Sequence, residues 1–405
     1  MWQDIKNIYH LFQAIAANLI YRFPSKDMTI IGVTGTDGKT TTSSLIYRIL
    51  HTAGLPTALI STVSAIINGK AYDTGFHVTT PNSLCLQSYI RKAKKEGVKF
   101  LVIETTSHGL HQNRLFGIPF KIAVLTNISN EHLDYHKTYE KYVAAKAKLF
   151  QSAKTAILNR DDKSLSYIFP YLKNKKIITY GLKKNSNINP ANSWFKTKLI
   201  GEFNLYNTLA AVAVARELSI KETVIAKACS SFTPPIGRTE IVYDKGFLVM
   251  IDFAHTPGSF QHLLPEINKL KKGRLIHIFG SAGNRDKYKR PEMGKISSKF
   301  ADIMILTAED PRNENVEKII SEIEKGIDRK FNKKNLLKIS DRKKAIFKAI
   351  ELAQTGDIVL LTGKGHEPSM NLGQGEVPWS EHQAVKEALA GLSFPSRRES
   401  SSIKT

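Results

Sequence analysis

Short hydrophobic runs alternate with amphipathic segments along most of the chain. The runs are rich in β-branched residues and end in small or polar residues, and helical patterns such as 40–53 and 139–150 lie between them. This alternation is typical of α/β units with a parallel sheet. The expected strands form two groups, 28–34, 99–104, 122–127 and 155–159 in the first and 247–252, 275–279, 303–307 and 357–361 in the second.

Two adjacent prolines, Pro234 and Pro235, separate the two groups, and they cannot continue a helix or a central strand. We therefore expect an α/β protein in which a P-loop-type central domain with a mostly parallel sheet, 28–235, precedes a Rossmann-like C-terminal α/β domain, 236–392. Residues 393–405 are rich in Ser, Arg and Lys without periodicity, so we expect a disordered tail there.

An amphipathic stretch, 5–23, precedes the first run. Polar residues that include Lys6, His10 and Gln13 interrupt it, so it is not a transmembrane span. It also lacks the basic start and clean apolar core of a signal peptide. We expect residues 1–27 to form a helix docked on the body of the protein, and a helix that contacts a membrane surface is the alternative.

Composition and charge narrow the class of protein. The chain of 405 residues is long enough for two or three domains. Cys85 and Cys229 lie far apart and outside any Cys/His cluster, which argues against disulfides and zinc and favours the cytoplasm. The formal net charge of +23 attracts anions, but no stacking-aromatic or groove-reading motif accompanies it, so we expect no nucleic-acid partner. A monomer is expected.

Residues 30–41 predict a strand, a glycine-rich turn and the start of a helix. Backbone N–H groups of such a turn surround phosphate oxygens, and the helix N-terminus adds a favourable partial positive charge. Lys39 would pair with the β- and γ-phosphates and Thr40 would ligate Mg²⁺. The usual first glycine is replaced by Val33, so Gly35 takes over its role. The expected ATP-binding residues are Gly35, Thr36, Asp37, Gly38, Lys39, Thr40 and Thr41.

Residues 33–41 resemble the variant phosphate loop of the Mur ligase family, which builds the peptide stem of bacterial cell walls, and further matches run from Thr29 to about Leu389. E-T-T-S-H-G-L begins at Glu104, T-N-I-S-N-E-H-L-D-Y-H contains His132, and Y-V-A-A-K ends at Lys146. The resemblance implies that Glu104 holds Mg²⁺, that His132 contributes to a second Mg²⁺, and that Lys146 is carbamylated and ligates metal or supports a nearby cation. These residues and Lys39 form the expected catalytic set.

Three further matches concern the nucleotide. G-E-F-N-L-Y-N carries Asn204 and Asn207, G-R-T-E carries Arg238, and D-F-A-H-T-P carries Asp252 and His255. The resemblance implies that the asparagines contact the nucleotide and that Arg238 reaches ATP from the second domain. A crevice that closes between the domains would exclude water from a hydrolysis-prone intermediate.

Residues 280–290 and 363–367 look most like the branch of the family that adds the third amino acid to the D-glutamate carboxylate. Arg312 favours meso-diaminopimelate, because a planar guanidinium can clamp its extra carboxylate with two bonds. Glu309 and Asp310 stand where this branch often has D-N, in the motif D-N-P-R. Glu367 would bind the distal ammonium of diaminopimelate. The expected substrate-binding residues are Thr79, Thr80, Thr106, Gln112, Arg114, Arg285, Arg290, Asp310, Arg312, Gly363 and Glu367. For Thr79 and Thr80, a purely structural cluster of hydroxyl groups is the alternative.

The start of the chain departs from the family. Its members carry roughly a hundred residues before the phosphate loop that bind the uridine nucleotide, a typical size for a domain, and Lys39 lies too near the start for this. The sequence therefore leaves open whether the chain recognises UDP. A lipid-linked acceptor, a different muramoyl peptide, and binding with a partner's help stay open.

The resemblance implies an ATP- and Mg²⁺-dependent ligase. A muramoyl-L-Ala-D-Glu carboxylate would attack the γ-phosphate of ATP, and an amine would convert the acyl phosphate to an amide, with release of ADP and phosphate. His108 and His255 are weak candidates for proton transfer. The alternatives are a folylpolyglutamate- or cyanophycin-type ligase, a non-catalytic nucleotide-binding scaffold, and a nucleic-acid-dependent ATPase.

Overall fold

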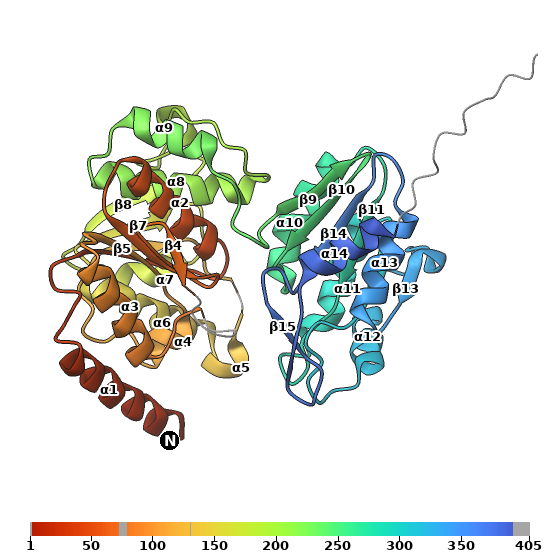
Figure 1. Ribbon diagram of the computed structural model, residues 1–405, viewed down its shortest axis with the longest axis horizontal. Helices are drawn as coiled ribbons and strands as arrows, with labels where there is room; N and C mark the ends of the chain where they lie inside the picture. Colours follow the sequence, from red (N-terminus) through yellow and green to blue (C-terminus); the bar gives the residue numbers. More distant parts are fainter. Residues whose placement is uncertain (1, 73–78, 130, 392–405) are drawn as a thin grey trace, which may run out of the picture. The chain divides into compact units, whose positions relative to one another are not determined.

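The computed structural model describes residues 2–72, 79–129 and 131–391, and it divides into two compact units (Figure 1). Unit 1 comprises residues 1–239 with 261–267, and unit 2 comprises 240–260 with 268–405. The division falls shortly after Pro234 and Pro235. Both units are α/β with mostly parallel sheets, which confirms the expected fold class. The expected tail, 393–405, lies outside the described residues.

Unit 1 is built on an eight-stranded sheet in the order β4-β3-β2-β5-β1-β6-β7-β8. The strands from β2 to β8 in this order run parallel, whereas β3 and β4 add an antiparallel hairpin at one edge. The bounds are β1 Thr29–Thr34, β2 Thr57–Ile60, β3 Ala65–Ile67, β4 Lys70–Tyr72, β5 Phe100–Glu104, β6 Phe120–Leu125, β7 Thr155–Asn159 and β8 Lys176–Tyr180.

Helices cover both faces of this sheet because successive strand residues point to opposite sides. Ile31 and Val33 of β1 pack with α2, α8 and α9, whereas Ile30 packs with α3, α6 and α7 on the other face. The bounds are α2 Lys39–Thr52, α3 Ser83–Lys95, α4 Ser107–His111, α5 Leu133–His136, α6 Tyr139–Ser152, α7 Leu165–Ile168, α8 Glu202–Glu217 and α9 Glu222–Ser231, with short 3₁₀ turns at Phe169–Tyr171 and Pro190–Asn192.

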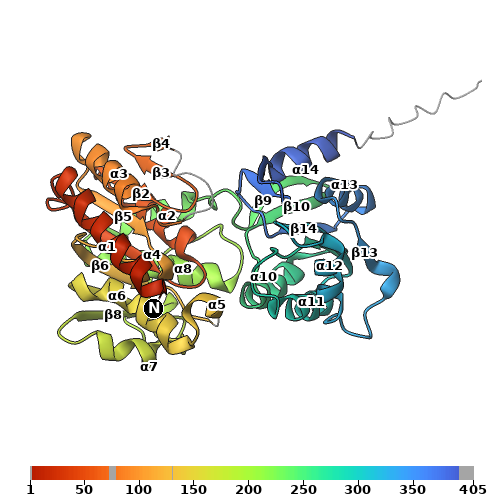
Figure 2. The same ribbon diagram turned by 90° about the horizontal axis from the view of Figure 1, so that it is seen from below.

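The first helix, α1 (Trp2–Ile20), packs on α3 at the outside of unit 1 (Figure 2). Its buried side consists of small and polar residues, Ala14, Ala17 and Asn18. Asn18 donates to Phe116 O at 2.9 Å and accepts from Gln87 Nε2 at 3.2 Å. The large apolar side chains of the helix are exposed instead: Ile5, Ile8, Tyr9, Phe12, Ile15, Leu19 and Ile20. Among the described residues, no helix combines the length and apolar character needed to cross a membrane.

Unit 2 has a six-stranded sheet in the order β13-β12-β11-β14-β10-β9, parallel except for the edge strand β9. Helices α13 and α14 cover one face, and Phe260 of α10 packs on the other face against His277. The bounds are β9 Glu240–Lys245, β10 Phe247–Asp252, α10 Pro257–Leu270, β11 Leu275–Phe279, α11 Lys289–Phe300, β12 Ile303–Leu306, α12 Val316–Glu324, a 3₁₀ turn Lys333–Asn335, β13 Leu336–Lys338, α13 Arg342–Leu352, β14 Ile358–Thr362, β15 Ser369–Asn371, β16 Glu376–Pro378 and α14 Glu381–Ala390.

Candidate active site

The loop between β1 and α2 requires glycine at two positions. Gly38 has a φ of 78°, in the left-handed region, and a Cβ there would lie 2.1 Å from Asn207 Oδ1. A Cβ on Gly35 would lie 1.8 Å from Thr126 Oγ1. The two glycines therefore let the loop pass close to side chains from β6 and α8, and they leave its N–H groups at the start of α2.

The residues that follow β6 hold this loop in place. Thr126 Oγ1 donates to Asp37 O at 2.6 Å, Asn127 Oδ1 accepts from Asp37 N at 3.0 Å, and Asn127 O accepts from Thr36 N at 2.8 Å. Lys39 Nζ donates to Thr36 O at 2.7 Å, so its ammonium lies over the loop. This arrangement is suited to the phosphates of a nucleotide.

Thr40 and Glu104 bring their side-chain oxygens together at the base of the loop. Thr40 Oγ1 lies 3.0 and 3.1 Å from the two carboxylate oxygens of Glu104, and both residues are buried. Thr62 N donates to Glu104 Oε2 at 3.0 Å, and Arg238 Nη2 lies 3.5 Å from Thr40 Oγ1. Thr41 is buried in the same helical turn. A hydroxyl beside a carboxylate is the donor set that Mg²⁺ prefers, so these residues fit the ion.

Lys146 is buried beside the phosphate loop. Its Nζ donates to Gly35 O at 2.6 Å and lies 4.4 Å from the ring centroid of Tyr142, whose hydroxyl is 3.1 Å from Thr36 Oγ1. Burial, and then the positive charge of Lys39, hold the pKa of Lys146 well below its usual value. The structure therefore brings the expected modification site to the loop itself.

His132 lies at the start of α5 with a φ of 55°. Its side chain is 42% exposed, its Nε2 is 3.8 Å from Glu131 Oε2, and its ring meets that of His108 with the centroids 4.9 Å apart. Within the described part of the chain, no three His, Cys, Asp or Glu side chains gather closely enough to hold a metal ion. A role of His132 in metal binding stays a prediction.

A cluster of aromatic side chains adjoins His132. Tyr135 accepts a hydrogen bond from Gln112 Nε2 at 3.2 Å and lies 3.1 Å from His111 Nδ1. Burial, and then the neighbouring His108 and His111, lower the pKa of His136 to about 3. Gln112 is therefore part of this cluster, which the motif matches alone did not reveal.

Asn204 and Asn207 join α8 to α2. Asn207 Nδ2 donates to Asn204 Oδ1 at 3.0 Å, Asn204 Nδ2 donates to Ile200 O at 2.8 Å, and Thr42 Oγ1 donates to Asn207 Oδ1 at 3.3 Å. The amide of Asn207 thus lies beside the phosphate loop and that of Asn204 supports it, and contact with the adenine ring stays a prediction.

The predicted acceptor-binding threonines form a hydroxyl cluster. Thr80 Oγ1 lies 3.1 Å from Thr106 Oγ1, and Thr62 Oγ1 donates to Thr79 Oγ1 at 3.0 Å. Arg114 Nη1 donates to Thr80 O at 2.7 Å. Because Thr62 also contacts Glu104, the cluster continues to the base of the phosphate loop.

In unit 2, Asp252 and His255 lie at the carboxyl end of β10. Asp252 Oδ1 accepts from Ala254 N at 2.7 Å, and His255 Nδ1 is 2.8 Å from Phe253 O. Lys289 Nζ donates to His255 O at 2.8 Å. These bonds fix the turn between β10 and α10.

The buried Lys364 joins the loops after β12 and β14. It lies within the matched segment 363–367, but the expected site did not include it. Lys364 Nζ lies 2.8 Å from Asp310 Oδ1 and 2.6 Å from Glu367 Oε2. Gly363 has a φ of 106°, and a Cβ there would be 2.9 Å from Glu309 Oε2. Three of the expected substrate residues, Asp310, Gly363 and Glu367, are therefore brought together.

The loop after β11 joins this group through Arg312. Arg312 has a φ of 52°, its Nη1 donates to Gly283 O at 3.0 Å, and its backbone N donates to Asn371 O at 3.0 Å. Arg285, in the same loop as Gly283, is exposed. Arg312 is thus held by the backbone around it and remains partly exposed.

Arg290 has a different environment from the other predicted substrate residues. Its side chain is fully buried, and Nη1 lies 2.9 Å from Glu314 Oε2 and 2.6 Å from Glu322 Oε2. Its Nη2 donates to Ala282 O at 2.9 Å. These contacts give Arg290 a structural role in fixing the loop after β11 to α12, and its contact with substrate stays a prediction.

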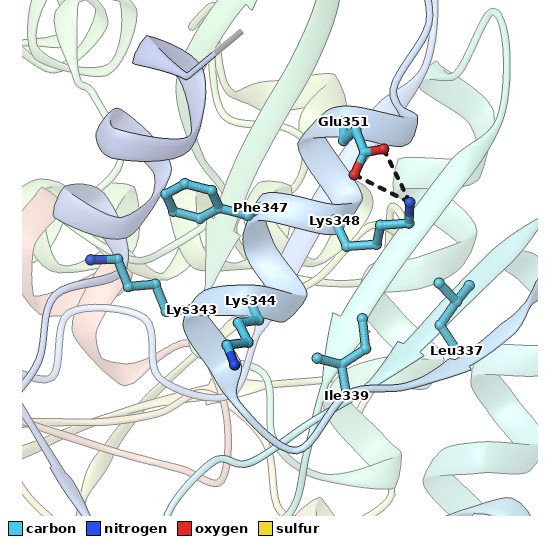
Figure 3. Close-up of a pocket in the computed structure, with 7 residues that line it drawn as sticks. All are labelled: Leu337, Ile339, Lys343, Lys344, Phe347, Lys348 and Glu351. Atoms are coloured by element: carbon cyan, nitrogen blue, oxygen red, sulfur yellow. Dashed lines mark hydrogen bonds and ion pairs between the residues drawn. The ribbon is translucent and has the colours of Figure 1, made fainter.

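A surface groove of about 520 Å³ lies elsewhere on unit 2, between β13 and α13 (Figure 3). Three apolar and four charged side chains line it: Leu337, Ile339, Phe347, Lys343, Lys344, Lys348 and Glu351. No predicted site residue lines this groove, so it is separate from the loops described above.

Comparison with known proteins identifies the family of the chain. The model of the Mur ligase middle domain matches residues 33–215, and that of the Mur ligase glutamate ligase domain matches 237–365. The UDP-N-acetylmuramoyl-L-alanyl-D-glutamate–2,6-diaminopimelate ligases of Aquifex aeolicus and Caldanaerobacter subterraneus are 40% and 39% identical to this chain over 396 residues, which cover 93% of it and 80% and 81% of the relatives.

Solved structures show the same fold. One of a UDP-N-acetylmuramoyl-L-alanyl-D-glutamate–2,6-diaminopimelate ligase has a TM-score of 0.64 at 30% identity and covers 96% of this chain and 83% of its own. E. coli FolC in complex with ADP has a TM-score of 0.69 at 20% identity and covers 88% and 90%, which is a likeness of fold alone. The chain therefore belongs to the Mur ligase family and is an ATP-dependent, ADP-forming ligase.

Proposed function

We propose that this ligase adds meso-diaminopimelate to the D-glutamate carboxylate of a muramoyl-L-Ala-D-Glu acceptor during the synthesis of peptidoglycan precursors. The observation that carries the proposal is the buried Thr40–Glu104 pair beneath a phosphate loop, in a chain whose relatives are named for this reaction. A carboxylate is a poor electrophile, and a site for a triphosphate supplies the means to activate it.

Unit 1 carries the nucleotide side of the reaction. The loop N–H groups and Lys39 hold the phosphates of ATP while the acceptor carboxylate attacks the γ-phosphorus, and ADP leaves. Mg²⁺ bound by Thr40 and Glu104 would neutralise phosphate charge. The amine then attacks the acyl phosphate, which releases phosphate and forms the amide.

Carbamylation of Lys146 belongs to the same proposal. Its amine would add to carbon dioxide with loss of a proton, and the carbamate would replace a cation by an anion with two oxygens. The burial of Lys146 and its contact with Gly35 O support this, because a carbamate there would lie against the phosphate loop and near Lys39. Mass spectrometry after trapping of the carbamate tests it, and an unmodified Lys146 in the active enzyme would contradict it.

Unit 2 carries the amino-acid side. The guanidinium of Arg312 would clamp the distal carboxylate of meso-diaminopimelate, and Glu367 would bind its distal ammonium. Lys364 supports this arrangement because it offsets the charges of Asp310 and Glu367 inside the loops. A lysine substrate lacks the second carboxylate and would leave Arg312 without its ligand.

The test is an assay of ADP release with UDP-muramoyl-dipeptide and, in turn, meso-diaminopimelate, lysine, glutamate and no amino acid. We expect turnover with meso-diaminopimelate and a selective loss of it in Arg312→Ala, whereas Arg329→Ala, at an exposed arginine of unit 2, is the control. Equal use of lysine would refute the specificity. Turnover with glutamate on a folate acceptor would favour the folylpolyglutamate-type alternative, and no phosphate release would favour a scaffold.

The exposed apolar face of α1 supports contact with an anionic membrane surface by the monomeric enzyme. Basic residues adjoin the carboxyl end of this helix, where Arg91 Nη1 donates to Tyr21 O at 3.3 Å and Lys94 pairs with Asp27. Apolar side chains beside basic ones are the combination that anionic lipid binds. Co-sedimentation with vesicles rich in phosphatidylglycerol should be lost in Phe12→Glu, and Trp194→Glu is the exposed control. Lipid contact would be refuted if the parent protein did not bind the vesicles. It would also be refuted if the exposed face instead caused the protein to self-associate and Phe12→Glu abolished this association.

A further inference from the structure

Unit 2 contains a buried arginine that none of the sequence motifs includes. Arg342 begins α13 and is 2% exposed. Its Nη1 donates to Ala308 O at 3.1 Å and its Nη2 to Thr362 O at 2.8 Å. Its Nε donates to Glu381 Oε1 at 2.7 Å, and Glu381, the first residue of α14, is also buried. The guanidinium is therefore held between one carboxylate and two backbone carbonyls.

The two carbonyls lie at the starts of the loops that carry the proposed amino-acid site. Ala308 directly precedes Glu309 and Asp310, and Thr362 directly precedes Gly363. These loops follow β12 and β14, which are not neighbours, because β11 lies between them in the sheet. Strand pairing therefore does not join the loops directly, whereas the planar guanidinium spans both with a fixed geometry.

A second bridge joins the same loops further along. Lys364 Nζ contacts Asp310 Oδ1 at 2.8 Å, and Gly363 is packed tightly against Glu309. Arg342 thus fixes the bases of the loops, and Lys364 joins them where the predicted substrate residues lie. The cost of burying the guanidinium is offset only because Glu381 and both carbonyls pair with it.

We propose that Arg342 is a positioning residue for the amino-acid substrate. It holds the loops 307–312 and 363–367 at the separation that Arg312 and Glu367 need to bind the two ends of one amino acid. It acts through these loops and does not touch the substrate. The proposal rests on the proposed function, in which these loops bind the incoming amino acid.

The test compares Arg342→Lys with Arg274→Lys. Arg274 makes the same kinds of bonds, to Asp357 Oδ2 at 2.7 Å and to Leu352 O at 2.7 Å, but it precedes β11 and so lies at the opposite end of the sheet. A lysine in place of Arg342 keeps the charge but cannot span both carbonyls. We expect its KM for meso-diaminopimelate to rise between roughly ten- and a hundredfold, with the KM for ATP unchanged. Arg274→Lys should leave both KM values unchanged.

Hydrogen exchange gives a readout that does not depend on turnover. Amides in 307–312 and 363–367 should exchange faster together in Arg342→Lys and not in Arg274→Lys. Glu381→Gln keeps the guanidinium and should cause a smaller rise in KM. An unchanged KM for meso-diaminopimelate, an equal rise in both KM values, or the same rise in Arg274→Lys would overturn the proposal. If the parent enzyme makes no product with meso-diaminopimelate, the proposed function fails. Independently of that, unchanged hydrogen exchange at the two loops in Arg342→Lys would refute the role of Arg342.

Discussion

Glu104 is the carboxylate that we propose to hold Mg²⁺ on the nucleotide side of the site. Replacing Glu104 with Gln keeps the size of the side chain and removes its charge beside Thr40. We expect kcat to fall roughly a hundredfold, as when one preorganised group is removed from the stabilisation of a transition state, and the Mg²⁺ concentration for half-maximal activity to rise. A Mg²⁺ titration of ADP release measures both, with the exposed Glu96→Gln as control. An unchanged Mg²⁺ dependence would contradict metal binding at Glu104.

We expect His277 to make the stability of unit 2 depend on pH. Burial, and then the charge of Arg342, lower the pKa of His277 from 6.5 to about 3, and its nitrogens lie 2.8 Å from Ser297 Oγ and 3.0 Å from Thr362 Oγ1. Between these pH values the unfolded chain binds a proton that the native state does not. The free energy of unfolding should therefore fall as the pH drops below 6.5, by at most about 1.4 kcal/mol per pH unit.

Urea unfolding at pH 7, 6 and 5 measures this effect. Trp379 reports on unit 2 once Trp2 and Trp194 are replaced by Phe. His277→Gln should flatten the dependence on pH, whereas His51→Gln, at an exposed histidine, should not. The same slope in His277→Gln and the parent would show that other groups cause it.

Single site residues could be anticipated from the sequence only where a local motif names them. The strand, glycine turn and helix start placed Lys39 and Thr40 correctly at one loop, and Glu104 joined them because parallel strands end at one edge of a sheet. The pairing of Arg290 with Glu314 and that of Lys364 with Asp310 could not be inferred, because these partners come from distant parts of the sequence. Such pairings depend on the tertiary structure and leave no local pattern.

Among the elements, the phosphate loop makes the strictest demand on a residue type. Gly38→Ala places a Cβ against Asn207 at a left-handed φ, so we expect loss of nucleotide binding and a destabilisation of about 1–3 kcal/mol. Gly97→Ala is a matched control because Gly97 has a φ of 74° but no atom within 4 Å of the added Cβ. Calorimetric titration with ADP and thermal unfolding separate the two effects. Equal behaviour of both variants would mean that backbone strain alone matters.

Buried central strands were predicted, whereas short edge strands were missed. The runs 247–252 and 275–279 coincide with β10 and β11, because both faces of these strands are covered and their sequences are apolar except for Asp252 at the end of β10 and His277 within β11. The pattern missed β3 and β4, which have three residues each. Asn68 and Gly69 connect them with φ values of 45° and 84°, and this Asn-Gly pair is a hairpin signal that could have revealed them.

At the scale of the whole molecule, we propose a different kind of site for each of the two compact units. A ligand stabilises the unit that binds it, so Mg²⁺–ADP should raise the unfolding temperature of unit 1 and meso-diaminopimelate that of unit 2. Differential scanning calorimetry with each ligand tests this, and Trp379 fluorescence assigns the transition of unit 2. A single transition that both ligands raise equally would contradict the division of the two roles between the units.

Both sheets end in strands that discourage growth by addition of another chain. The outermost strands are β4 and β8 in unit 1 and β9 and β13 in unit 2, and each carries an exposed lysine at one end: Lys70, Lys176, Lys245 and Lys338. A strand arriving from a second molecule would have to bring its backbone alongside these charges, and β4 and β13 offer only three residues each to pair with. We therefore expect these two sheets to resist edge-to-edge aggregation when the enzyme is concentrated for crystallisation or storage.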